Sequence, residues 1–154
     1  MPSEPHKLTA AEMKDRDTET LRLLLNLKAV FKKYISKRDR YRSVMGDNAI
    51  RNVGISHFFG SAGSPNEAIA YNEMNVHVMS NRLHRQYHES NPLPYIRFML
   101  EKYGQEELDK LEKLSMINHR LTKQEIIDTT NHFVKLTKSL GEVDRLKEYK
   151  AGKK

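Results

Sequence analysis

The 154-residue sequence contains no cysteine and no tryptophan. The lack of cysteine excludes disulfide bonds, zinc-thiolate sites and thiol nucleophiles, and it leaves the cellular compartment open. No apolar stretch approaches the roughly 20 residues that a helix needs to span a bilayer. The N-terminal MPSEPHKL holds two prolines and an acid in place of an apolar segment, so we expect no secretory signal.

Acidic residues are scarce in one stretch, Arg22 to Arg51. It holds nine of the 27 Lys and Arg but only two of the 20 Asp and Glu, so its net charge is 9 − 2 = +7. The rest of the chain carries 18 bases and 18 acids and is neutral. Because the whole excess charge lies in thirty residues, the sequence predicts an anionic partner that binds there.

Motifs for catalysis are also lacking. The glycines match neither G-x-G-x-x-G nor G-x-x-x-x-G-K-[ST], and there is no G-x-S-x-G around Ser61. His84 and His88 have the i, i+4 spacing of metal ligands, with His77 seven residues earlier, but Arg85 stands where an H-E-x-x-H site needs glutamate. We therefore expect no enzymatic activity, no cofactor, no metal and no small-molecule substrate.

The basic stretch has the periodicity of a long helix, from Asp17 to Met45. Its apolar residues recur every three, four or seven positions: Leu24, Leu27, Phe31, Tyr34, Tyr41 and Met45. Beyond Ser36 charge surrounds the predicted helix on nearly every side. Gly46-Asp47-Asn48 predicts a turn, followed by a short helix from Ala49 to Phe59, and residues 60–63 (GSAG) predict a flexible hinge.

The remainder predicts a helical body. Ser64, Pro65 and Glu67 have the pattern of a helix start, and the helix is expected to reach about Ser90. Further helices are predicted over 95–103, around 108–117 and after a capping box at 122–125. No stretch alternates long enough to predict a strand. The expected fold is all-α, with a long basic N-terminal helix-turn-helix arm followed by an antiparallel helical bundle.

This pattern divides the chain into a flexible lead-in (1–16), a basic nucleic-acid-binding arm with its hinge (17–63), a helical bundle (64–149) and a basic tail (150–154). Lysine and arginine at helical spacing can follow a phosphate backbone, and interleaved tyrosines add stacking or a hydroxyl. The predicted nucleic-acid-binding residues are Lys28, Lys32, Lys33, Lys37, Arg38, Arg40, Arg42, Arg51, Tyr34 and Tyr41. The alternative is a solvated basic face on a packed helix.

The layout resembles that of the major coat proteins of filamentous archaeal viruses, the rod-shaped and lipid-enveloped families with linear double-stranded DNA. The features that carry the resemblance are the basic segment from Leu27 to Arg42, the break at Gly46-Asp47, the short helix from Ile50 to Phe59 and the bundle from Pro65 onward. The resemblance implies a virion protein whose arms encase DNA independently of sequence. Its partners would be double-stranded DNA and copies of itself or a related coat protein, with membrane contact only through an envelope.

A second hypothesis remains open beside this one. The chain would then be a helical subunit of a large intracellular assembly, such as an organellar complex or a ribonucleoprotein. Its basic helix would dock on RNA or on acidic protein. The formation of long filaments with DNA distinguishes the two hypotheses, because a coat protein forms them and an assembly subunit does not.

Overall fold

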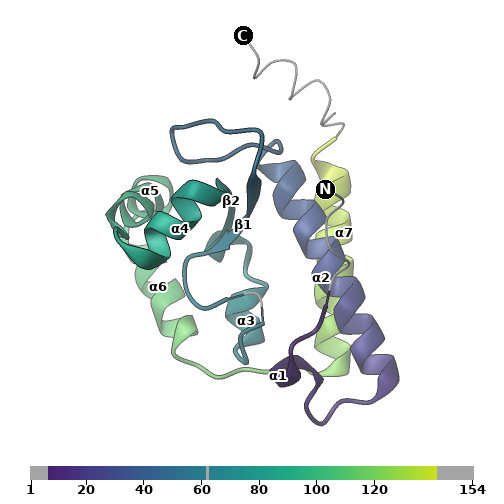
Figure 1. Cartoon of the computed structure of the whole chain (residues 1–154). Coiled ribbons are helices and arrows are strands. Elements are labelled where there is room, and N and C mark those ends of the chain that lie inside the picture. The colour runs from purple at the N-terminus through teal and green to yellow at the C-terminus, as the bar shows by residue number, and fades with distance from the viewer. Residues whose placement is uncertain (1–6, 62, 142–154) are drawn as a thin grey trace.

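The computed structural model describes residues 7–61 and 63–141. In these ranges the chain is mostly helical, as predicted, and it also contains one two-stranded antiparallel sheet (Figure 1). The elements are α1 (Ala10–Met13), α2 (Thr18–Arg38), β1 (Val53–His57), α3 (Glu67–Ala70), the 3-10 helix η1 (Glu73–Asn75), β2 (Val76–Ser80), α4 (Asn81–Glu89), α5 (Leu93–Tyr103), α6 (Gln105–Ser115) and α7 (Lys123–Ser139).

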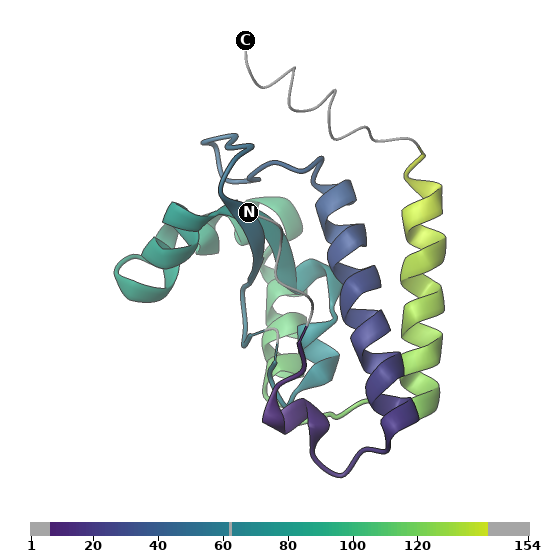
Figure 2. The same ribbon diagram turned by 45° about the vertical axis from the view of Figure 1, so that its right-hand side comes forward.

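The small sheet lies between two groups of helices. Helices α2 and α7 stand on one side of it, and α4, α5 and α6 stand on the other (Figures 1 and 2). Val76 and Val78 belong to the apolar cluster with α2 and α7, whereas Met79 belongs to the cluster with α5 and α6. The sheet therefore joins the two parts of the core.

Helix α2 packs along α7, and the two run in the same direction (Figure 2). Leu24, Leu27 and Ile35 are fully buried, and the ring of Phe31 meets that of Phe133 edge to face at 4.9 Å between centroids. The same cluster includes Val76 from the sheet. The core thus contains residues from both sides of the predicted boundary at 63/64.

The long helix is confirmed, but its predicted end at Met45 is wrong. Asp17 caps its start, since the Asp17 carboxylate accepts a hydrogen bond from the Thr20 N–H at 2.7 Å. Its end comes at Arg38, after which Arg40 and Tyr41 have left-handed φ angles of 59° and 57°. The Tyr41 N–H then bonds to the Ser36 carbonyl at 2.8 Å. This reversal turns the chain toward the sheet.

Strands replace parts of two predicted helices. The segment expected as a helix from Ala49 to Phe59 contains β1, and the helix expected from Ser64 to about Ser90 is divided into α3, η1, β2 and α4. Strands β1 and β2 pair in the register Val53 with Ser80, Ile55 with Val78 and His57 with Val76. All five residues of β2 are buried, so both of its faces are covered and the sequence shows no alternation.

The start of the second predicted helix also differs. Asn66, not Ser64, is the N-cap of α3. The Glu67 side chain binds Arg16 instead of the backbone at the predicted helix start. The Arg16 guanidinium donates two hydrogen bonds to the Glu67 carboxylate, at 2.6 and 2.5 Å, and both side chains are buried. Residues 10–16 of the predicted lead-in are thereby fixed to the body.

Several helix ends are as predicted. The capping boxes at Thr9–Glu12 and Thr122–Glu125 are both present, and Gly104 ends α5 with a φ of 85°. Helix α6 covers most of the predicted 108–117 segment. The part of the predicted bundle from 142 to 149 and the basic tail at 150–154 lie outside the described residues, as do residues 1–6.

Candidate anion-binding surface

Arg38 is part of the structural framework. Its guanidinium donates to the Asp39 carboxylate at 2.8 and 3.0 Å and to the carbonyls of Glu73 and Val76 at 2.6 Å each. The Asp39 carboxylate in turn accepts the Val78 N–H at 2.8 Å. Burial by itself lowers the pKa of Arg38, but the Asp39 carboxylate more than offsets it, so the pKa is raised. With these bonds made, Arg38 fastens α2 to β2 and is not placed for phosphate.

Three more predicted binding residues are engaged within the fold. Tyr34 is buried and its hydroxyl donates to the Glu73 carboxylate at 3.0 Å; burial, with this bond, raises the pKa of Tyr34 to about 12. Lys28 donates to the Glu12 carboxylate at 2.9 Å and to the Lys7 carbonyl at 2.8 Å. Lys37 is 3.4 Å from the Thr137 carbonyl on α7. Of these, only Lys37 lies near the outer surface beside α7.

The remaining predicted residues form the accessible part of the basic surface. Lys33 is exposed and Lys32 half-buried, and neither has an ion-pair partner within 7–61 and 63–141. Arg40 and Arg51 are exposed, and Tyr41 and Arg42 half-buried, in the segment 39–52 that follows α2. Each of these four also makes contacts within the protein. The segment is tied to β2 through the Val44 N–H and the Val78 carbonyl, at 3.0 Å.

Lys28 and Lys32 lie on the edge of α2 that borders the N-terminal segment and β1. Lys33 and Lys37 share the other edge, from which Lys37 reaches the Thr137 carbonyl on α7. The spacing of four residues within each pair explains this division, because such residues are neighbours on one helix face. Between the two edges lies the buried stripe of Leu24, Leu27 and Phe31. The surface therefore has two rows of positive charge, separated by the face that packs on the rest of the protein.

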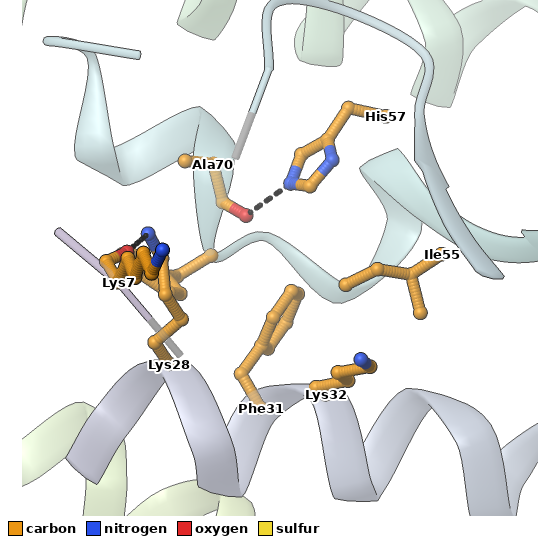
Figure 3. A pocket seen from close by; sticks show the side chains of 8 residues that line it. Lys7, Lys28, Phe31, Lys32, Ile55, His57 and Ala70 are labelled. Carbon is orange, nitrogen blue, oxygen red and sulfur yellow. Dashed lines mark hydrogen bonds between the residues drawn. The ribbon is translucent and has the colours of Figure 1, made fainter. Parts of the chain in front are cut away.

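The first row borders a cavity of about 300 Å³. Its walls come from α2, β1, the end of α3 and the N-terminal segment (Figure 3). The lining residues are Lys7, Lys28, Phe31, Lys32, Ile55, His57, Ala70 and Tyr71. In Figure 3, Lys7 and Lys28 lie on one side of Phe31, and Lys32 lies on the other. The cavity thus combines an apolar and aromatic wall with three ammonium groups.

His57 forms a neutral part of this wall. Its Nε2 lies 3.0 Å from the Ala70 carbonyl oxygen (Figure 3), which can only accept, so Nε2 carries the hydrogen. Burial is the main cause that lowers the pKa of His57 to about 4. At neutral pH the positive charge around the cavity therefore belongs to the lysines alone.

The histidines considered as metal ligands are separated. His77 is buried on β2 between the hydroxyls of Tyr95 and Tyr103, at 3.2 and 2.7 Å, and burial strongly lowers its pKa. The rings of His84 and His88 meet edge to face on α4, with centroids 4.5 Å apart. Among the described residues, no group of three or more His, Cys, Asp or Glu is arranged to hold a metal ion. In the same residues no helix is long and apolar enough to cross a membrane.

Sequence reasoning missed Lys7, Ile55, His57 and Tyr71 as members of a site. The spacing of Lys28 and Lys32 indicated a shared face, but the other residues meet them only because β1 pairs with β2 beside α2. Val53, Ile55 and His57 lie at every second position, as in a strand, but the sequence from Ala49 to Phe59 also fits a short helix.

The chain was compared with family models, curated proteins and solved structures, and it matches none of them.

Proposed function

We propose that this protein is a structural, non-enzymatic nucleic-acid-binding protein that binds the phosphate backbone of double-stranded DNA without sequence preference. The observation that carries the proposal is the concentration of +7 net charge in residues 22–51, with Lys33 exposed on α2 without an ion-pair partner in the described residues. Lysine and arginine side chains that neutralise phosphates release condensed counterions, which favours binding to any sequence.

The packing of α2 changes the geometry expected for this binding. Freeing α2 so that nucleic acid surrounds it would expose Leu24, Leu27, Phe31 and Ile35, at a cost of roughly 6 to 12 kcal/mol. Phosphate contacts alone would have to offset that loss. We therefore propose that the nucleic acid lies across the outer edge of α2 and the segment 39–52, while α2 stays packed on α7.

Three cations at the outer edge provide the test: Lys33, Lys37 and Arg40. Replacing all three with alanine should weaken duplex binding similarly for every sequence, and it should lower the magnitude of the log–log salt slope by about 3. The control replaces Arg85, Arg97 and Lys113, which are exposed on α4, α5 and α6 and remove the same charge. Equal losses in the two triple variants, measured by fluorescence anisotropy, would show that only net charge matters and would refute the proposed surface.

Assembly into a helical filament, as in a virion coat, remains a prediction of the resemblance described above. Electron microscopy of the protein mixed with linear duplex DNA tests it, with protein alone as the control. Regular filaments whose length follows the DNA length are expected. Isolated protein particles scattered along bare DNA would contradict the coat hypothesis while leaving DNA binding intact.

A second candidate function, a subunit of a larger assembly, is favoured by an apolar surface elsewhere. Met116 and Ile117 are 75% and 55% exposed in the connection between α6 and α7, which passes beside α1 (Figure 1). Exposed apolar side chains that gather at one place often mark protein interfaces. Under this hypothesis the double variant Met116→Ser with Ile117→Ser would no longer bind the neighbouring subunit of the assembly, whereas its binding to duplex DNA would be unchanged.

A further inference from the structure

We propose that the cavity between α2 and β1 binds a nucleotide that carries a phosphate monoester, either a free nucleoside 5′-monophosphate or the 5′-phosphorylated end of a strand. The inference rests on the proposed function, because it assigns a nucleotide to this site. It adds a ligand different from the internal phosphodiesters that the outer edge of α2 would contact.

The charge around the cavity matches a monoester. Lys7, Lys28 and Lys32 line it, and the Glu12 carboxylate is paired with Lys28, so the local formal charge is 3 − 1 = +2. A phosphate monoester carries about −1.5 to −2 at neutral pH. An internal phosphodiester carries only a single negative charge, and so does a carboxylate. The monoester is therefore the anion that best balances this site.

Lys28 is held in position to contact such a ligand. Its ammonium has three N–H groups, of which two donate to the Glu12 carboxylate and the Lys7 carbonyl. One donor remains, on a side chain whose position is fixed by the other two bonds. Lys32, with no ion-pair partner in the described residues, adds a second ammonium on the other side of Phe31 (Figure 3).

The walls suit a planar organic group of limited size. Phe31, His57 and Tyr71 contribute rings, and Ile55 contributes an apolar side chain. A volume of about 300 Å³ is at the small end of ligand pockets and far exceeds that of inorganic phosphate. The combination of a dianion and a single planar group describes one nucleotide better than a long lipid chain.

The Tyr71 ring forms part of the cavity wall. Its hydroxyl is fully buried and lies near the Glu12 carboxylate. Burial, followed by the Glu12 and Glu67 carboxylates, raises its pKa, so the hydroxyl keeps its proton and remains a donor. The hydroxyl therefore stays with Glu12, and the ring of Tyr71 is the part that a ligand in the cavity would contact.

Adjacent lysines give a matched pair of variants. Lys32→Gln and Lys33→Gln each remove one positive charge from α2, but only Lys32 lines the cavity. Isothermal titration with adenosine 5′-monophosphate should show one saturable site that Lys32→Gln weakens about tenfold and Lys33→Gln leaves unchanged. Equal effects of the two variants, or no saturable binding, would overturn the inference, as would inorganic phosphate binding as tightly as the nucleotide.

Further measurements keep the test independent of folding and of the proposed function. In the unaltered protein, the nucleotide should shift the amide NMR signals of Ile55 and Ala70. If only the signals of residues outside the cavity shift, the site is refuted. A 5′-phosphorylated hexanucleotide that binds more tightly than its 5′-hydroxyl counterpart identifies a strand end, whereas equal binding of the two identifies the free nucleotide. Duplex DNA with 5′-hydroxyl ends tests the proposed function separately, because Lys33→Gln should weaken its binding, whereas Lys32→Gln, on the cavity edge of α2, should leave it nearly unchanged.

Discussion

Replacing Arg38 with alanine should lower the free energy of unfolding of the protein, even when no nucleic acid is present. The Arg38 side chain is 16% exposed and that of Asp39 3%, and Arg38 also satisfies two backbone carbonyls. Removing one partner of a buried pair typically costs 3 to 5 kcal/mol, and the partial exposure of Arg38 places the expected loss near 3 kcal/mol. For a chain of this length such a loss lowers the Tm by roughly 6 to 12 °C.

Urea unfolding followed by circular dichroism measures this loss, and Lys33→Ala is the control. Lys33 is exposed and lacks an ion-pair partner in the described residues. The free energy of unfolding of Lys33→Ala should therefore stay within about 0.5 kcal/mol of that of the unaltered protein. The double variant Arg38→Ala with Asp39→Ala should lose less than the sum of the single variants, because no uncompensated carboxylate then remains. If Arg38→Ala is as stable as Lys33→Ala, the structural role assigned to Arg38 is refuted.

Three further outcomes follow from the packing and the backbone. Phe31→Ala should lower the free energy of unfolding by about 3 to 5 kcal/mol, because it removes a ring packed against Phe133; a loss below about 1 kcal/mol in urea would contradict the α2–α7 core. The pKa of His57 is about 4 in the folded protein and about 6.5 in the unfolded chain, so the unfolded chain binds more protons between these pH values. The free energy of unfolding should therefore fall as the pH drops from 6.5 to 4, and His57 should account for up to about 3 kcal/mol of the fall. His57→Gln should remove that share in urea titrations at pH 7 and 4.5, and an unchanged pH dependence would refute it. Gly104→Ala, at a φ of 85°, should cost about 1 to 2 kcal/mol, whereas Gly46→Ala, which meets no neighbouring atom, should be nearly neutral by thermal melting.

Local signals predicted some of the helix ends. The two capping boxes and the stop at Gly104 depend on side chains within a few residues of the backbone groups they serve, so the sequence contains all the required information. The stripe from Leu24 to Tyr34 likewise predicted the buried face of α2. The sequence did not show which element covers that face, because α7 lies about a hundred residues later.

The strands could not be recognised for a physical reason. Val76 to Ser80 is buried on both faces, which removes the alternation that identifies a strand, and its apolar residues also fit a helical repeat with Ile69 and Leu83. Its pairing with β1 is a non-local contact. The end of α2 at Arg38 depends in the same way on the bonds of Arg38 and Asp39 to residues 73–78.

The candidate site was predicted in part. A count of charges located the basic surface, and exposed Lys33, Arg40 and Arg51 agree with a surface that is open to a partner. Composition alone could not separate these residues from Arg38 and Lys28, whose charges are used inside the fold. The cavity depends on the sheet, so it was not foreseen.

The salt dependence of duplex DNA affinity tests the central proposal most directly. Of the eight predicted cations, Lys28 and Arg38 are held in ion pairs within the fold and Lys32 lies on the cavity edge of α2, which leaves 8 − 3 = 5 for phosphates. With about 0.9 counterions released per phosphate, log Kd against log salt concentration should change with a slope of magnitude about 4.5, for any DNA sequence. A Kd that stays constant as the salt concentration rises would contradict backbone binding by this surface.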